Sequence, residues 1–349
     1  MTAPVGILSL ATASPPHELH QDAVLKIARE VFTPHFPAFE RMAPVFHAAG
    51  IQTRQCAMPM DWYLQPRGWP ERMAAYAEAA DDLFARAAQG ALAQAGLVGA
   101  DVDAIVTVSS TGIVTPSLEA RAMARLGFRS DVARIPVFGL GCAGGATGLA
   151  LAARVAKAEP GSSVLFLCVE LCTLSFRLDE PSKADIVATA LFGDGAAACV
   201  LRTGDAGFAR VVAAGEHLWP DTLDIMDWRV DPQGLGVIFA QSIPPFARRE
   251  MRPALDSILA RQNLTVEDVD RFICHPGGMK VIEALEASLD LGQGALDLER
   301  AVLADHGNMS APTALFVLDR ARNRGLPQRC VLTSLGPGFT ASTVTLQAA

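Results

Sequence analysis

The chain has 349 residues, of which 50% are apolar and 19% charged, and its net charge is −8. This length accommodates two domains or one duplicated domain with a large core. The acidic balance and the lack of a long Lys/Arg run argue against a nucleic-acid partner. No apolar stretch approaches the ~18 residues that a membrane span requires.

Cysteine usage and the N-terminus point to a reducing compartment. The seven cysteines are scattered and odd in number, which does not suit a disulfide framework. The N-terminal segment MTAPVGILSLATASPP has no basic region, and its apolar part is too short for a signal peptide. We therefore expect a soluble, cytoplasmic globular protein.

The first third of the chain predicts a helix over Asp22–Val31 and a long Ala-rich helix over Arg72–Ala95. The segment 32–70 between them is irregular and rich in Pro, Met, Trp and His. We expect this segment to cover the surface or an entrance. Its arginines Arg54 and Arg67 are typical of solvated surface side chains.

The chain contains an internal repeat. Asp-Val-Asp precedes a predicted strand at 101–103 and again at 268–270, and a helix follows each strand, Ser117–Leu126 in the first copy and Met279–Leu289 in the second. Each copy then has a small-residue turn that opens another helix, GCAGGATG or HGNMSAPTA, and ends in a Gly-punctuated hairpin. Strands that alternate with helices in a duplicated unit predict mostly parallel sheets covered by helices.

The turn GCAGGATG contains a lone cysteine, Cys142. A buried strand is predicted over Ile135–Leu140, and Leu149, Ala152 and Ala156 lie at helical spacing, so Cys142 marks the turn into a helix. Unpaired N–H groups and the helix dipole favour the thiolate, which is the nucleophilic form. A buried structural cysteine explains the same pattern, and this stretch alone leaves both interpretations open.

The duplication brings three polar side chains together. Cys142 and Asn308 are equivalent, because each opens the corresponding helix of its copy, and equivalent positions of two packed halves face each other near their pseudo-two-fold axis. His275 ends the second-copy strand beside a Pro-Gly-Gly turn and can reach the same place. A core histidine and a helix-capping asparagine are the alternative interpretations.

Other motifs carry weaker signals. Cys274 precedes His275 but points to the opposite face of the strand, so the two do not pair as nucleophile and base. Cys168 and Cys172 lack the second ligand pair of a metal site. The segment Gly193–Gly195 has the composition of a hairpin turn rather than of a phosphate-binding loop.

Together these segments resemble the chalcone synthase family, the type III polyketide synthases on the thiolase fold. Five motifs occur in the family's order and spacing over nearly the whole chain: FGLGCAGGATG, ALFGDGAAA, HPGG, GNMSAPTA and GPGFT. The resemblance implies an α/β fold in which two αβαβα halves, 1–205 and 206–349, form five layers. It also implies a homodimer.

The resemblance also implies the site. Cys142 carries the acyl group, with His275 and Asn308 as its partners. Phe192 is the gatekeeper phenylalanine, and Val237 stands where the plant enzymes commonly have a second one. Further substrate-binding residues are expected at Arg54, Thr111, Ser175, Gly336, Pro337, Gly338 and Phe339. The implied substrates are acyl-CoA and malonyl-CoA, with no metal or redox cofactor.

The implied reaction is iterative decarboxylative condensation of malonyl-CoA onto an acyl-CoA starter held on Cys142. A ketoacyl-ACP synthase III would share the fold and the three polar residues but perform one condensation, and HPGG and GPGFT favour the polyketide enzyme. A catalytically inactive acyl-CoA-binding protein is the third alternative.

The size of the acyl-CoA starter is predicted from the residues at the entrance of the substrate pocket. Val237 in place of phenylalanine widens the mouth, although Trp228 just upstream is large enough to fill that space. The chain is also poor in aromatic residues, at 6%. A flexible alkyl chain should therefore pass. We predict fatty acyl-CoA starters and alkylpyrone or alkylresorcinol products.

Overall fold

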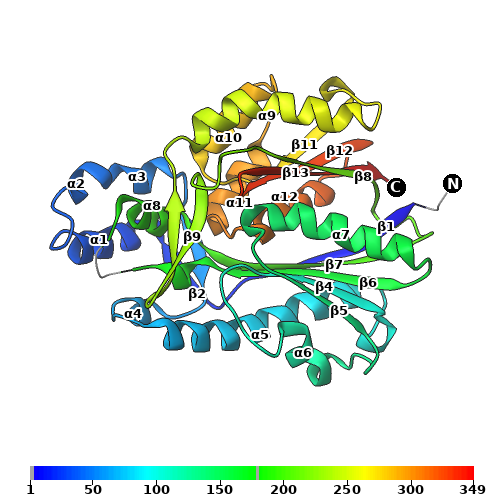
Figure 1. The fold of residues 1–349 in the computed structure, drawn as a ribbon, viewed down its shortest axis with the longest axis horizontal. Helices are drawn as coiled ribbons and strands as arrows, with labels where there is room; N and C mark the ends of the chain where they lie inside the picture. The colour runs from blue at the N-terminus through cyan, green and yellow to red at the C-terminus, as the bar shows by residue number, and fades with distance from the viewer. Residues whose placement is uncertain (1–3, 178–180) are drawn as a thin grey trace.

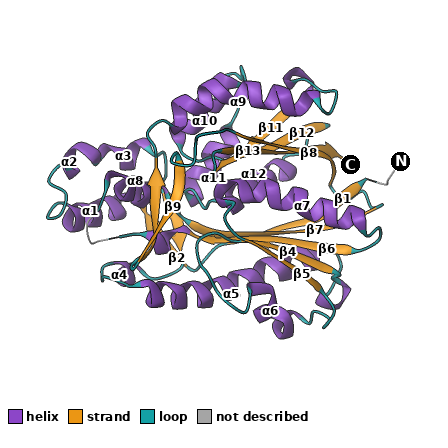
Figure 2. Cartoon of the chain, viewed as in Figure 1, coloured by secondary structure: helices purple, strands orange, loops and turns teal. Residues whose placement is uncertain are grey.

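The computed structural model describes residues 4–177 and 181–349, which form two β-layers alternating with three helical layers (Figures 1 and 2). One outer layer is made of α5 (Trp69–Gln94) and α6 (Leu118–Leu126). These helices cover the strands of the N-terminal half, which are β1 (Val5–Ala13), β4 (Ala104–Val108), β5 (Ala133–Val137), β6 (Ser163–Leu171) and β7 (Asp194–Thr203).

The middle layer separates the two β-layers (Figure 1). It consists of α7 (Gly144–Ala158), α11 (Asp297–His306) and α12 (Ala311–Asn323). The second β-layer contains β8 (Ala209–Leu218), β11 (Arg271–Cys274), β12 (Arg329–Gly336) and β13 (Thr340–Ala348). The other outer layer is formed by α9 (Ile243–Ala260) and α10 (Met279–Ser288). The predicted five-layered αβαβα arrangement is confirmed.

Both β-layers belong to one nine-stranded sheet, in the order β11-β12-β13-β8-β1-β7-β6-β4-β5. The layers join where β1 and β8 pair over a short stretch, Val5 with Val211 and Gly6 with Arg210. Only β4 with β5, β4 with β6 and β11 with β12 run parallel. The sheet is therefore mixed rather than mostly parallel, because β7 and β13 return antiparallel to their neighbours.

The duplication is visible in matching hydrogen bonds. Each Asp-Val-Asp segment starts in a 3-10 turn, η1 (Gly99–Asp101) or η4 (Val266–Asp268). Its last aspartate then accepts from the first backbone N–H of a neighbouring strand. Ser163 donates to Asp103 (2.8 Å) in the first half, and Arg329 donates to Asp270 (2.7 Å) in the second. The two halves use the same local device to start equivalent strand pairs.

The glycines of the middle layer allow its helices and sheet to approach closely. A Cβ at Gly145 would lie 2.3 Å from the carbonyl oxygen of Ala311 at the start of α12. A Cβ at Gly148 would lie 2.4 Å from the ring of Phe166 in β6. Only glycine fits at such approaches, so the GCAGGATG turn brings the starts of α7 and α12 together.

The remaining elements gather at one end of the layers (Figure 1). The helices there are α1 (Gln21–Phe32), α2 (Phe39–Met42), α3 (Pro44–Ala48), α4 (Met60–Tyr63) and α8 (Lys183–Leu191). Two small sheets pair β2 (His17–His20) with β3 (Thr53–Cys56), and β9 (Met226–Asp231) with β10 (Gly234–Phe239). The segment 32–70 is thus structured rather than irregular.

Three local expectations were wrong. Arg54 lies in β3 with its side chain fully buried, whereas Arg67 is 28% exposed and pairs with Glu71. The strand expected to be buried is β5, which forms an exposed edge because β4 is its only neighbour. Gly193–Gly195 is no hairpin turn: it joins α8 to β7, and buried Asp194 accepts backbone hydrogen bonds there.

All seven cysteines are buried and unpaired. Within residues 4–177 and 181–349, no helix has both the length and the apolar character for crossing a bilayer.

Candidate active site

Cys142 lies in η2 (Gly141–Ala143), the buried 3-10 turn between β5 and α7. Gly141 has φ +48°, and a Cβ there would lie 2.7 Å from Cδ of Pro337. A Cβ at Gly336 would lie 2.6 Å from Cβ of Ala143. Gly336 and Pro337 of the C-terminal half therefore pack directly on the turn that carries the thiol. The predicted position of Cys142 at a helix start is confirmed.

Asn308 lies at the equivalent position before α12. Its backbone forms a bridge with Phe192: the Gly193 N–H donates to the Asn308 carbonyl (3.0 Å), and the Asn308 N–H donates to the Leu191 carbonyl (2.8 Å). Its side-chain oxygen accepts from the Ser310 N–H (2.8 Å). Ser310 is itself the N-cap residue of α12, so Asn308 is not the helix cap. The backbone bridge places Phe192 next to Asn308 in the fold.

His275 follows β11 directly, and its N–H donates to the Thr333 carbonyl of β12 (2.8 Å). The side chain is buried, and neither ring nitrogen has a hydrogen-bond partner among the described residues. The following loop reaches Asn308, whose Nδ2 donates to the Gly277 carbonyl (3.2 Å). Buried polar groups of structural residues are normally hydrogen-bonded. An imidazole with free nitrogens is instead available to a substrate.

Burial governs ionisation at this site. It raises the pKa of the Cys142 thiol to about 11 and lowers the pKa of His275 to about 4. Hydrogen bonding by Ser310 and Asn308 lowers the thiol pKa, and the charge of Glu170 raises it further. Thiol and imidazole are therefore both neutral at rest near pH 7. Burial therefore opposes the thiolate that the helix start is predicted to favour.

Glu170 is a buried carboxyl group that the sequence analysis missed. It accepts from the Ser110 N–H (2.9 Å) and from the Thr111 hydroxyl (2.7 Å). The Ser110 hydroxyl in turn accepts from the Gly141 N–H (3.1 Å), which connects the carboxyl group to the cysteine turn. Burial raises the Glu170 pKa to about 8. A single acid in the otherwise apolar strand SVLFLCVEL was the available signal.

An apolar wall adjoins the polar residues. Phe192 and Val237 lie in one buried cluster, and Phe192 contacts the rings of Phe239 (5.5 Å between centroids) and Trp228 (6.3 Å). Val237 in β10 stands directly opposite Trp228 in β9. The structure thus brings the two predicted gatekeepers together and adds two aromatic rings. We call Phe192, Trp228, Val237 and Phe239 the acyl wall.

Two predicted polar pocket residues make local contacts. The Thr111 hydroxyl accepts from the Leu171 N–H (2.8 Å) in addition to its bond with Glu170. The Ser175 hydroxyl donates to the Cys172 carbonyl (2.7 Å), which belongs to the same cluster as Phe192. Both lie on the N-terminal half near the cysteine turn.

Two other predicted residues have fully buried side chains. Arg54 packs behind Phe192, where Cβ atoms added at Gly193 and Gly307 would lie 3.2 and 3.4 Å from its side chain. Its burial lowers the guanidinium pKa to about 10. Phe339 is fully buried in the C-terminal core against Trp219 and Phe246. A Cβ at Gly338 would meet Leu218 at 2.8 Å.

A duplicated five-layered fold with a buried cysteine where its halves meet defines the class of thiolase-fold enzymes that transfer acyl groups. Two family models match the chain: the N-terminal domain of chalcone and stilbene synthases over residues 67–205, and their C-terminal domain over residues 210–349. The chain belongs to the chalcone and stilbene synthase family and is a type III polyketide synthase. This membership decides against the ketoacyl-ACP synthase III alternative.

Characterised relatives agree with this assignment. A 1,3,6,8-tetrahydroxynaphthalene synthase of Streptomyces peucetius subsp. caesius is 38% identical over 98% of this chain and 92% of its own length. A 3,5-dihydroxyphenylacetyl-CoA synthase of Amycolatopsis balhimycina is 31% identical over 77% of this chain and 74% of its own. The crystal structure of the 1,3,6,8-tetrahydroxynaphthalene synthase of Streptomyces coelicolor A3(2) has a TM-score of 0.93 at 28% identity, covering 98% of this chain and 99% of that one.

Proposed function

We propose that this type III polyketide synthase loads a fatty acyl group onto Cys142, extends it with malonyl units and yields alkylpyrones or alkylresorcinols. The observation that carries the proposal is the apolar wall directly beside the polar group. Phe192 is bridged to Asn308 through the backbone and packs against the side chains of the β9–β10 hairpin. An acyl chain on Cys142 would lie along this wall.

In the loading step, His275 acts as the base. The neutral thiol passes its proton to the imidazole, and the thiolate attacks the thioester carbon of acyl-CoA. The bond between this carbon and the CoA sulfur breaks, and the imidazolium returns the proton to the CoA thiolate. Because the thiol and imidazole exchange one proton, no net charge enters the buried site.

In the extension step, malonyl-CoA binds with its thioester oxygen toward His275 and Asn308. Loss of CO₂ places negative charge on this oxygen, and the two N–H donors stabilise the enolate. The Asn308 Nδ2 carries two hydrogens and uses one of them on Gly277, so the other is available. The enolate carbon attacks the Cys142 thioester, the thiolate leaves, and the chain grows by two carbons.

Phe192 has a separate role in this step. Phe192 is joined to Asn308 through the backbone, and we propose that its apolar ring disfavours the malonyl carboxylate relative to neutral CO₂. The substrates are the CoA thioesters themselves, and the condensation requires no redox change.

The starter follows from the acyl wall. Each methylene buried there contributes up to ~0.8 kcal/mol, which is about fourfold in affinity per carbon. Trp228 and Phe239 narrow the space next to Val237, which favours a slim alkyl chain over an aromatic ring. The names of the relatives define the alternative, a short starter that leads to an aromatic product such as tetrahydroxynaphthalene.

The deciding experiment is mass spectrometry of products formed from malonyl-CoA alone and with acyl-CoA starters from acetyl to palmitoyl. We expect the highest kcat/KM for long chains and alkylated products. Efficient conversion of malonyl-CoA alone into one aromatic product, with no gain from longer starters, would overturn the fatty acyl assignment. If the protein binds acyl-CoA but releases neither CO₂ nor condensation products from malonyl-CoA, it is an inactive acyl-CoA-binding protein instead.

We further propose that the chain forms a homodimer and that its halves divide at residues 205 and 206. The matching aspartate hydrogen bonds of the two halves support the division. The exposed edge strand β5 supports a second copy as partner.

A further inference from the structure

The β9–β10 hairpin forms a two-stranded sheet of its own, separate from the nine-stranded sheet. It crosses the end of the layers at a steep angle to the main strands (Figure 1). The hairpin carries Trp228 and Val237 at directly opposed positions. The hairpin strands are not hydrogen-bonded to the nine-stranded sheet. Other contacts must therefore fix the position of Trp228 and Val237.

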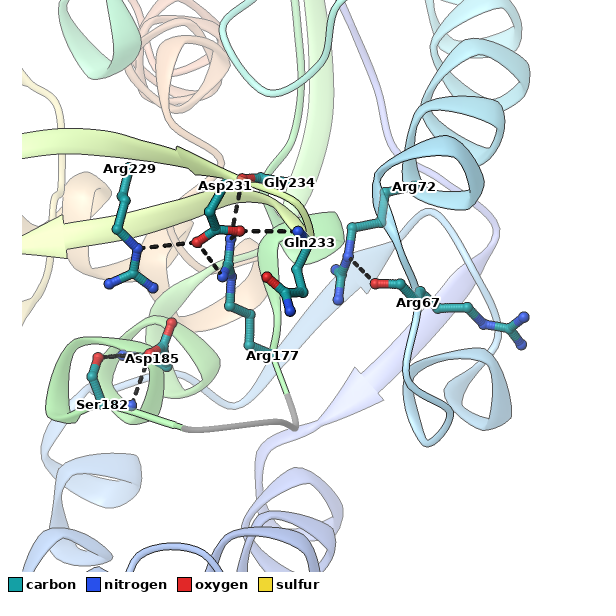
Figure 3. Close-up of polar contacts among 9 residues, drawn as sticks. All are labelled: Arg67, Arg72, Arg177, Ser182, Asp185, Arg229, Asp231, Gln233 and Gly234. Carbon is teal, nitrogen blue, oxygen red and sulfur yellow. Dashed lines mark hydrogen bonds and ion pairs between the residues drawn. The ribbon is translucent and has the colours of Figure 1, made fainter.

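A forked ion pair holds the tip of the hairpin. Arg177 donates to both carboxylate oxygens of Asp231, over 2.7 and 2.9 Å, and also to the Gly234 carbonyl (3.1 Å) (Figure 3). The side chains are 6% exposed at Arg177 and 20% exposed at Asp231. A planar guanidinium bound at two points fixes orientation as well as distance.

The other side of the tip rests on the body of the protein. The Trp69 N–H at the start of α5 donates to the Pro232 carbonyl (3.4 Å). A Cβ at Gly234 would lie 3.3 Å from the side chain of Arg72, which itself donates to the Leu174 carbonyl. The tip is therefore held between Arg177 and the first turn of α5.

Arg177 is connected to the site as well as to the hairpin. It follows Phe176, which packs on the cluster of Phe192 and Val237, and the 3-10 turn η3 (Cys172–Ser175). The Asp231 carboxylate also accepts from the Arg229 Nε (3.1 Å) and the Gln233 N–H (3.0 Å). The hydrogen bonds of Arg177 lower the Asp231 pKa to about 2, so the Asp231 carboxyl group is ionised near neutral pH.

We propose that the Arg177–Asp231 pair is a positioning clamp that fixes the β9–β10 hairpin, and with it the Trp228–Val237 side of the acyl wall, and thereby determines which starters the enzyme accepts. The inference rests on the proposed role of Val237 in starter binding. Neither residue touches the reacting atoms. Loss of the clamp acts through the hairpin, so it changes starter binding more than the chemistry at Cys142.

The chain offers a matched control. Arg300 and Glu286 form a second forked pair, over 2.6 and 2.7 Å, with side chains 25% and 7% exposed. Glu286 also accepts backbone hydrogen bonds, as Asp231 does. This pair joins α10 to α11, and among the described residues it makes no hydrogen bond or ion pair with the hairpin. Asp231→Asn and Glu286→Gln therefore remove comparable ion pairs at different places.

The experiment measures kcat and KM for octanoyl-, palmitoyl- and coumaroyl-CoA in wild type, Asp231→Asn, Arg177→Lys and Glu286→Gln. We expect Asp231→Asn to reduce the preference for palmitoyl over coumaroyl about tenfold, mainly through KM, with an unchanged rate of iodoacetamide labelling at Cys142. Arg177→Lys keeps the positive charge but cannot form the two parallel hydrogen bonds to Asp231. It should therefore reduce the preference for palmitoyl over coumaroyl by a smaller factor. Glu286→Gln should lower Tm without changing the preference.

If Asp231→Asn and Glu286→Gln change the preference for palmitoyl over coumaroyl equally, the clamp is overturned. A general loss of stability would then explain both variants. The clamp is also overturned if Asp231→Asn changes the preference by less than about twofold. If Asp231→Asn does not fold, Arg177→Lys and Glu286→Gln make the same comparison. Val237→Phe separates the two proposals: if it alters starter preference and the clamp variants do not, the clamp fails and the acyl wall stands.

Discussion

At Cys142, burial and the Glu170 charge oppose ionisation of the thiol, while Ser310 and Asn308 favour it. In the proposed mechanism, Cys142 becomes nucleophilic when His275 takes its proton. His275 is suited to this because burial keeps it neutral and leaves both ring nitrogens without partners among the described residues. The proposed mechanism therefore consists of a proton exchange between two buried groups that are neutral before the reaction.

Cys142→Ala should abolish polyketide formation, because the acyl group loses its point of attachment. His275 and Asn308 remain, so slow decarboxylation of malonyl-CoA should persist. Product analysis and CO₂ release measure the two activities separately. Cys168→Ala, at a buried cysteine on β6, is the control and should still condense. Full condensing activity without Cys142 would contradict the assignment.

Asn308→Ala should depress decarboxylation by about 10²–10³-fold, the range for loss of one oxyanion donor. Loading of Cys142 should fall much less, because the enolate oxygen is the proposed partner of the carboxamide. Single-turnover acylation by radiolabelled acyl-CoA and steady-state CO₂ release give the two rates. If both rates fell by the same factor, Asn308 would serve only to hold the Gly277 loop.

Glu170→Gln should lower the pKa of Cys142. The carboxylate of Glu170 disfavours the thiolate, and its pKa of about 8 places its ionisation below that of the thiol at about 11. The rate of iodoacetamide labelling at Cys142 rises with pH as the thiolate forms. Without the Glu170 charge this rise should occur at lower pH, so labelling near pH 9 should be faster than in wild type. A profile displaced to higher pH would show that Glu170 supports the thiolate through hydrogen bonds.

Among the elements, the β9–β10 hairpin packs against Phe192 and completes the acyl wall, and we propose that its side chains define the space for the starter. Val237→Phe adds a ring next to Trp228. We expect kcat/KM for palmitoyl-CoA to fall by at least about tenfold, while acetyl-CoA is affected little, because only the long chain needs the space. An undiminished preference for palmitoyl-CoA in this variant would place the alkyl channel elsewhere. Val212→Phe, on the exposed side of β8, is the control.

At the scale of the whole molecule, β5 ends the nine-stranded sheet with its outer edge unpaired among the described strands. Pro136 within it is tolerated because proline is confined to edges and bulges of sheets. Phe138, directly after β5, is 54% exposed. An open edge next to an exposed aromatic residue is a surface that a second copy can cover.

Light scattering at micromolar concentration should therefore give twice the chain mass of 36.8 kDa. Phe138→Asp should shift the mass toward that of the single chain, because it places a charge in the apolar contact. Val98→Asp, at another exposed apolar position, should remain a dimer. A wild-type protein of single-chain mass would contradict the homodimer.

Local sequence patterns predicted the features that depend on neighbours along the chain. Cys142 between a strand and a helix, His275 beside a Pro-Gly-Gly turn and the two Asp-Val-Asp copies are local patterns, and the repeat made Cys142 and Asn308 equivalent. Equivalent positions of a duplicated fold lie near each other where the two halves pack. Cys142 and Asn308 could therefore be expected to lie close together although they are 166 positions apart.

Burial and ion pairing depend on contacts between segments that lie far apart in the sequence. Arg54 lies in a polar strand segment that is typical of a surface, yet elements from elsewhere in the chain enclose it. β5 has an apolar pattern, yet nothing pairs with its outer edge. The resting state of Cys142 depends on Glu170 and on lost solvent, and the Arg177–Asp231 pair joins residues 54 positions apart. Such contacts depend on which surfaces the folded layers bring together, and no pattern along the chain encodes them locally.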